Sequence, residues 1–212
     1  MIVRAICLAT TLLAVSAYGA DPKLDQLLKQ VEERYNHAQT LQVLFTEQYT
    51  RPGEMRRQES GQLSLRKPGR MRWDYYSPIG KQFISDGKFL YLYTPDDRRA
   101  ERLKMKETDD MRAPLAFLLG RLNFQKDFQN IKGVTDGDAV RVVAEPRSQN
   151  LPYAAVEFVI TPDARIREVR VTAFDKSVLD FTFDQEKLNP PLSASLFQFQ
   201  PPAGVPVTDG EQ

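Results

Sequence analysis

The chain has 212 residues, of which 42% are hydrophobic and 27% are charged, and its formal net charge is +1. Such a balanced charge gives no net field that would recruit nucleic acid or an anionic membrane. With one histidine, His37, and one cysteine, Cys7, the chain cannot build a multi-histidine or cysteine metal site, so we expect neither a metal nor a cofactor.

The chain begins with the pattern of an export signal. A positive charge at Arg4 precedes an apolar run over residues 6–15, and small residues follow. The run is too short for a transmembrane helix, which needs about 20 apolar residues. We expect residues 1–17 to be a cleaved signal peptide, with cleavage after Ala20 as the alternative. No small residue directly precedes Cys7, as lipid attachment would require, so we expect an exported protein without a lipid anchor.

The first expected element of the mature chain is an amphipathic helix. Asp21 and Pro22 form a cap followed by a proline at the first helical position. Apolar residues then recur on one helical face, at Leu24, Leu27, Leu28, Val31, Tyr35 and Ala38. From Leu41 the apolar period changes to two, which predicts a first strand that continues to Tyr49.

Between Gly61 and Tyr93, large side chains recur at every second position, the spacing of one face of a strand. These residues are Leu63, Leu65, Met71, Trp73, Tyr75, Phe83, Phe89, Tyr91 and Tyr93. Turn residues interrupt the pattern at Pro68-Gly69, at residues 77–80 and at Asp86-Gly87. The stretch therefore predicts a four-stranded antiparallel meander with large rings on one face.

Two segments after the meander are less regular. Residues 98–105 are charged and predict an edge strand whose basic residues discourage pairing with other chains. Residues 113–122 contain an early proline and then suit a helix that is apolar on nearly every side. Such a helix is either buried in an ordinary core or acts as a lid between the sheet and an apolar ligand, and the residue pattern favours neither.

The remainder predicts strands separated by turn residues, the pattern of an all-β sandwich or barrel. These strands are expected near residues 128–134, 139–145, 153–161, 166–174 and 178–183. Rings at alternate positions resume late in the chain, at Phe181, Phe183, Phe197 and Phe199. We expect residues 21–207 to form a single domain and residues 208–212 to be a flexible tail.

Few residues fit an enzyme. A triad would have to use His37, which has the place of a helix-surface residue. The pairs Asp96-Asp97 and Asp109-Asp110 would suit glycoside hydrolysis, but adjacent acids between strands are more often solvated. The surplus of large apolar side chains is the stronger feature. Either the core takes them all, or a wide, incompletely closed sheet leaves an apolar cavity for fatty material.

Several motifs, taken in order, resemble one protein family. The meander carries a glycine, alternating leucines, a basic residue before a proline, and a tryptophan, at Gly61, Leu63, Leu65, Lys67, Pro68 and Trp73. A phenylalanine-containing first strand spans residues 43–48, a Ser-Asp-Gly-Lys hairpin 85–88, a proline-leucine segment 114–119, and the ending F-x-F-x-P-P-x-G-V residues 197–205. Together they resemble the periplasmic outer-membrane lipoprotein carriers of the LolA family, over essentially the whole mature chain.

The resemblance implies a mainly β fold, an incomplete and strongly curved antiparallel barrel of about 10–11 strands with helices covering its open mouth. It also implies a monomeric, non-enzymatic periplasmic carrier of acylated lipoproteins. Its partners would be an inner-membrane ATP-driven transporter that supplies the cargo and an outer-membrane receptor lipoprotein that accepts it. The alternatives are a lipid- or lipoprotein-binding sensor module of the same fold, and an uncharacterised hydrolase.

The resemblance also indicates site residues. We expect the cavity wall at Phe45, Met71, Trp73, Phe83, Tyr91, Phe181 and Phe183, and the lid at Leu115, Phe117, Leu118 and Leu119. Plain core packing is the alternative for each of them. The family has an arginine at the position of Lys67, thought to hold the lid shut, and lysine lacks the planar fork of donors. The latch is therefore expected at Lys67 or at a neighbouring arginine, namely Arg66, Arg70 or Arg72.

Overall fold

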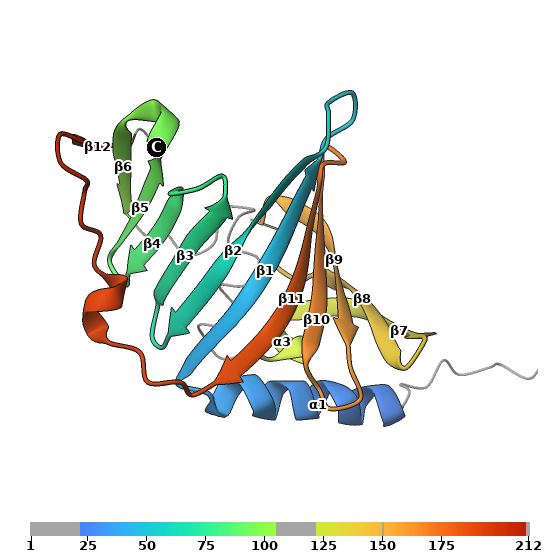
Figure 1. The fold of residues 1–212 in the computed structure, drawn as a ribbon. Coiled ribbons are helices and arrows are strands. Elements are labelled where there is room, and N and C mark those ends of the chain that lie inside the picture. Colours follow the sequence, from blue (N-terminus) through green and yellow to red (C-terminus); the bar gives the residue numbers. More distant parts are fainter. Residues whose placement is uncertain (1–21, 105–121, 150, 211–212) are drawn as a thin grey trace, which may run out of the picture.

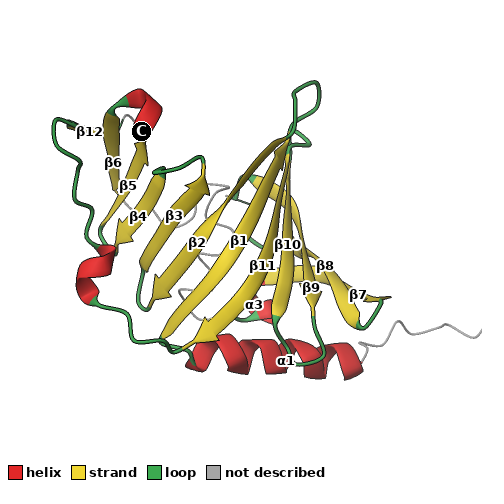
Figure 2. Cartoon of the chain, viewed as in Figure 1, coloured by secondary structure: helices red, strands yellow, loops and turns green. Residues whose placement is uncertain are grey.

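The computed structural model describes residues 22–104, 122–149 and 151–210, and the predicted signal peptide lies outside them. The described strands form one 12-stranded sheet in the order β12-β6-β5-β4-β3-β2-β1-β11-β10-β9-β8-β7. Figures 1 and 2 show this sheet strongly curled, with a long helix across one end. The predicted mainly β, incompletely closed barrel is confirmed, with more strands than the expected about 10–11.

The helices are α1 (Pro22–His37) and α3 (Phe124–Asp127), with 3₁₀ helices η1 (Pro95–Asp97) and η2 (Ala194–Phe197). The first strands are β1 (Thr40–Thr50), β2 (Arg57–Arg66), β3 (Arg70–Ser77), β4 (Gln82–Asp86), β5 (Phe89–Thr94) and β6 (Arg99–Lys104). The others are β7 (Phe128–Asp136), β8 (Ala139–Pro146), β9 (Tyr153–Ile160), β10 (Ile166–Ala173), β11 (Val178–Leu188) and β12 (Val207–Asp209).

The pairing register determines which side chains share a face of the sheet. Leu63 pairs with Trp73, and Trp73 pairs with Phe83, so β2, β3 and β4 present these side chains on the same face. Phe45 on β1 pairs with Phe183 on β11, which continues this face into the other half of the sheet. We call it the inner face, because its buried side chains form one core with those of α1.

Helix α1 is fixed to the sheet by its apolar stripe and by one tyrosine. Leu28, Val31 and Tyr35 are buried in the common core. The Tyr35 hydroxyl donates to Glu186 Oε2 at 2.6 Å and accepts from the backbone N–H of Ile166 at 2.9 Å. Burial, together with the neighbouring Glu186 carboxylate, raises the pKa of the Tyr35 phenol, so the hydroxyl keeps its proton. The tyrosine thereby joins α1 to both β10 and β11.

The segment at residues 122–127 is bound to α1 as well. The Asn36 side chain exchanges two hydrogen bonds with the backbone of Leu122, at 2.7 and 2.8 Å. Glu32 Oε1 accepts from the backbone N–H of Phe124 at 2.6 Å. The buried Phe124 ring then meets Phe158 edge-on, with centroids 5.4 Å apart. None of the described helices has the length and apolar character needed to cross a membrane.

Residues 189–210, which we call the C-terminal segment, run along the outer face of the meander (Figure 1). Arg66 Nη1 donates to the carbonyl of Leu192 at 3.0 Å, and Arg72 Nη1 donates to the carbonyl of Leu196 at 3.1 Å. Phe197 is buried within η2 rather than in a strand, so the late row of rings predicted through this residue is not formed.

The C-terminal segment ends in β12, which pairs in parallel with β6 through Thr208 and Glu101. Arg102 Nη2 and Asp209 Oδ1 form an ion pair at 2.7 Å. Strand β6, predicted to be an edge, therefore has a neighbour on each side. The predicted tail also begins too early, because Thr208 and Asp209 belong to β12.

Candidate ligand-binding site

Five rings form a cluster on the inner face. The Phe45 ring lies 4.7 Å from Trp73 and 5.1 Å from Tyr75, centroid to centroid, in edge-to-face geometry. Trp73 lies 5.5 Å from Phe181, which stacks on Phe183 at 5.9 Å. Such pairs contribute about 0.5–1.5 kcal/mol each beyond the area they bury. The ring cluster therefore joins β1, β3 and β11 into one apolar wall.

Most of the predicted wall residues come together in this core. The buried members are Phe45, Met71, Trp73, Phe83 and Phe181, and Phe183 packs at the border of the same core. The predicted lid residues Leu115, Phe117, Leu118 and Leu119 lie outside the described residues. That the wall and the lid bind a ligand stays a prediction.

Tyr91 lies on the other face of the sheet. In the β4–β5 hairpin Phe83 pairs with Leu92, so Leu92 takes the inner position and Tyr91 the outer one. The Tyr91 ring stacks on Phe199 of the C-terminal segment, with centroids 5.2 Å apart. The predicted place of Tyr91 in the wall is wrong, because this hairpin pairs odd-numbered with even-numbered residues and reverses the alternation of the preceding strands.

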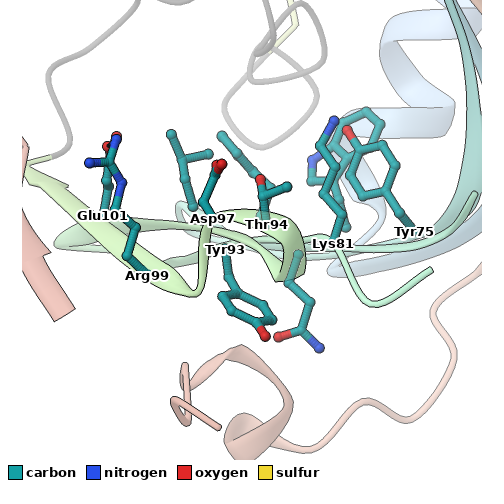
Figure 3. A pocket seen from close by; sticks show the side chains of 11 residues that line it. Tyr75, Lys81, Tyr93, Thr94, Asp97, Arg99 and Glu101 are labelled. Atoms are coloured by element: carbon teal, nitrogen blue, oxygen red, sulfur yellow. Dashed lines mark hydrogen bonds and ion pairs between the residues drawn. The ribbon is translucent and has the colours of Figure 1, made fainter. Parts of the chain in front are cut away.

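A cavity of ≈ 250 Å³ lies beside the ring cluster. Its apolar lining includes Trp73, Tyr75, Phe83 and Leu92, and its polar lining includes Lys81, Gln82, Thr94, Asp97, Arg99 and Glu101. Figure 3 shows Lys81, Thr94 and Asp97 pointing to one side of the strands, and Tyr93 to the other. Small-ligand pockets range over about 300–1,000 Å³, so this space suits one short apolar segment next to a polar group.

Three charged side chains that line the cavity, Lys81, Arg99 and Glu101, are paired. Lys81 pairs with Glu59, and its Nζ lies 4.3 Å from the centroid of the Tyr75 ring. The Tyr75 hydroxyl donates to Glu47 Oε2 at 3.2 Å. Arg99 pairs with Glu101 across 2.8 Å. The apolar pattern through Tyr91 and Tyr93 does not indicate this polar lining. The residues that alternate with them in β5, Leu92 and Thr94, carry the signal, because they take the inner positions of the strand and line the cavity.

Two buried side-chain donors, the Thr50 hydroxyl and the Trp73 indole N–H, face no acceptor in the described part of the chain. An unpaired buried donor costs about 1–3 kcal/mol, which a ligand with an oxygen acceptor would recover. Across the described ranges, no group of three His, Cys, Asp or Glu side chains is placed to hold a metal ion. Of the two predicted acid pairs, Asp97 lines the cavity and Asp109-Asp110 lies outside the described residues.

The predicted latch residues have separate partners. Lys67 Nζ donates to the carbonyls of Tyr35 and Asn36, at 2.7 and 3.0 Å, at the last turn of α1. Burial lowers the pKa of the Lys67 ammonium. Arg66 and Arg72 instead bind the C-terminal segment on the outer face. Among the described residues Lys67 therefore caps a helix end, where a cation is favourable, and its part in a lid latch stays a prediction.

Comparison with known proteins gives one consistent family. The model described as "Outer membrane lipoprotein carrier protein LolA" matches residues 36–200. An outer-membrane lipoprotein carrier protein of Chromobacterium violaceum is 26% identical over 201 residues, which cover 95% of this chain and 96% of the relative. A protein of the same name from Bordetella avium is 29% identical over 210 residues, covering 98% and 97%.

The crystal structure of an uncharacterized conserved protein from Thermus thermophilus shares the fold. It has a TM-score of 0.53 at 14% sequence identity, and the match covers 89% of this chain and 99% of that one. The family match runs from the end of α1 past β11, and so includes every strand that contributes to the ring cluster. The chain therefore belongs to the LolA family of outer membrane lipoprotein carrier proteins.

Proposed function

We propose that the protein is a periplasmic carrier without enzymatic activity, which binds the acyl chains of lipoproteins against its inner face. An inner-membrane ATP-driven transporter would supply the cargo, and the outer membrane, through a receptor lipoprotein, would accept it. The observation that carries the proposal is the apolar wall of rings on the inner face of a curled sheet, in a chain of the carrier family. The unpaired Trp73 donor adds a place for an ester oxygen of the cargo.

Acyl chains give such a carrier ample binding energy. Each buried CH₂ contributes about 0.8 kcal/mol, so a single chain of ~15 carbons gains on the order of 10 kcal/mol. A carrier must also release its cargo, so part of this gain has to be offset. The ring cluster supplies an offset, because contacts such as Phe45 with Trp73 exist before cargo arrives and must be exchanged for contacts with the acyl chains.

The test is native mass spectrometry of the protein purified from periplasm after co-expression with a lipoprotein, either acylated or with its acylated cysteine replaced. We expect a one-to-one complex with the acylated form only. Binding of neither form, or of both equally, would refute acyl recognition. Free fatty acid that accumulates steadily with incubation time in the acylated sample would instead indicate a hydrolase.

Two rings in one hairpin provide a matched pair of variants. Phe83→Ala removes an inner ring, whereas Tyr91→Ala removes a ring that stacks on Phe199 outside. We expect Phe83→Ala to reduce the fraction of complex several-fold and Tyr91→Ala to leave it within twofold, with circular dichroism confirming that both variants fold. Equal loss in both variants would place the acyl site elsewhere.

A further inference from the structure

Large hydrophobic side chains are exposed at one end of the sheet. Met55 is 90% exposed in the β1–β2 loop, Ile79 is 84% exposed in the β3–β4 turn, and Phe174 is 68% exposed in the β10–β11 turn. Tyr76, at the end of β3, is 58% exposed. The β1–β2 loop, the β3–β4 turn and the β10–β11 turn, with the end of β3, lie at the end of the sheet opposite α1, the upper end in Figure 1. A buried core cannot explain these side chains, because they lie at three separate connections between strands.

These loops form one continuous surface. Thr50 pairs with Val178, which places the β10–β11 turn beside the β1–β2 loop, and Arg51 Nε lies 3.8 Å from Asp175 Oδ2 between them. The ion pair of Lys81 with Glu59 links the β3–β4 turn to β2. A Cβ at Gly80 would lie 3.2 Å from Pro95 Cγ, so the next connection, η1, is adjacent as well. We call residues 51–57, 76–81, 95–99 and 174–177 the apolar rim.

The apolar rim is also basic. It holds seven basic residues, Arg51, Arg56, Arg57, Lys81, Arg98, Arg99 and Lys176, against four acidic ones, Glu54, Asp96, Asp97 and Asp175, for a net charge of +3. The whole chain has a net charge of +1, so the rim segments are more positive than the chain as a whole, although Lys81 and Arg99 pair with Glu59 and Glu101 on the adjoining strands. Whole-chain neutrality predicted no attraction to an anionic membrane, and the local excess changes that expectation.

We propose that the apolar rim docks on the surface of an anionic lipid bilayer. The core of a protein interface is a contiguous, closely packed apolar patch, whereas these tips are single side chains on separate loops. A bilayer interface accepts separate apolar side chains and attracts basic residues, each contributing about 1 kcal/mol near an anionic surface. Docking would bring Lys81, Asp97 and Arg99, which line the cavity, against the membrane.

The test is flotation of the protein with vesicles of phosphatidylethanolamine, with or without phosphatidylglycerol, containing no protein. We expect flotation that requires phosphatidylglycerol and weakens with salt. Ile79→Asp together with Met55→Asp should lower the partition coefficient on the order of tenfold, because each change puts a carboxylate where an apolar side chain enters the interface. The matched control is Val134→Asp, since Val134 is 62% exposed and lies in β7, next to Gly133, where an added Cβ would lie 3.0 Å from Leu24 Cδ1 of α1.

Three outcomes would overturn the proposal: no flotation of the unchanged protein, an equal loss in the Val134→Asp control, or flotation lost in Phe83→Ala but kept in the rim variant. A dimer in light scattering that Ile79→Asp abolishes, without vesicle binding, would show that the rim joins two copies instead. The proposal does not depend on lipoprotein carriage, because the vesicles contain none. Failure of the acyl-binding test with retained flotation would refute the carrier function alone.

Discussion

Gly61 lies in β2 beneath the ring cluster, close to the backbone of β3. It pairs with Phe45 on one side and Tyr75 on the other, and the absence of a side chain lets these two rings meet at 5.1 Å. A Cβ at this position would lie 2.1 Å from the carbonyl oxygen of Asp74 and 2.8 Å from the Cα of Tyr75. Both obstacles are backbone atoms, so Gly61→Ala must separate β2 from β3.

The cost can be worked from this geometry. Restoring an ordinary contact needs a separation of roughly 1 Å, which weakens two neighbouring ladder hydrogen bonds at about 1 kcal/mol each and one ring pair at about 1 kcal/mol. Alanine recovers about 0.4–1 kcal/mol through a less flexible unfolded chain. We therefore expect Gly61→Ala to lower the free energy of unfolding by about 2–3 kcal/mol, which lowers Tm by about 4–12 °C in a domain of this size.

Thermal and urea denaturation followed by circular dichroism measure this loss. The control is Gly133→Ala, also in a strand, where the new Cβ would meet the side-chain tip of Leu24 at 3.0 Å rather than backbone. Because that side chain can move, the control should change stability by less than about 1 kcal/mol. A Gly61→Ala protein as stable as the unchanged one, or a larger loss in the control, would refute the close-approach explanation.

Three further changes test other contacts. Tyr35→Phe should cost about 1–3 kcal/mol, because the N–H of Ile166 loses its acceptor. Because the pKa of Tyr35 is raised in the folded protein, the unchanged protein should lose stability as pH rises above about 10, where the tyrosine of the unfolded chain ionises. Urea denaturation at increasing pH should show a smaller loss of stability in Tyr35→Phe, which lacks this phenol. Lys67→Met should cost about 1 kcal/mol and Lys67→Arg less, since arginine keeps a cation at the end of α1; equal losses would exclude a role for the charge. Arg72→Gln should speed proteolysis near Leu196 with little change in Tm, and unchanged cleavage would show that this bond does not hold the C-terminal segment.

Local patterns were sufficient to predict most of the elements. The apolar stripe that includes Leu28 and Val31 predicted α1, and alternation through Trp73 predicted the strands of the meander. Both patterns depend on the period of the backbone and on burial of one face, which the sequence carries directly. The same logic identified the inner positions of Phe45 and Phe181, because each lies in a strand with a clear alternation.

The errors come from relations between elements. Alternation cannot show which face Tyr91 takes, because the parity of the pairing is set by the geometry of the hairpin before it. The Tyr35–Glu186 hydrogen bond joins residues 151 positions apart, and no local pattern carries that information. The attachment of the C-terminal segment depends on Arg72 reaching a backbone carbonyl, an acceptor that every residue offers. Such contacts follow only once the curl of the sheet is known.

The curl also brings together a core that stabilises the fold and would serve the acyl binding proposed above. Trp73 on β3 and Phe181 on β11 are separated by β2 and β1, which in a flat sheet would hold their backbones about 14 Å apart, yet their ring centroids lie 5.5 Å apart. The ring cluster thus stabilises the fold when no ligand is bound. The same apolar surface would be available to an acyl chain that displaces the contacts between the rings. Because the rings gain and lose similar contacts in that exchange, the net affinity for acyl chains should be well below the gross ~10 kcal/mol of burying one chain. A carrier that must release its cargo requires this balance.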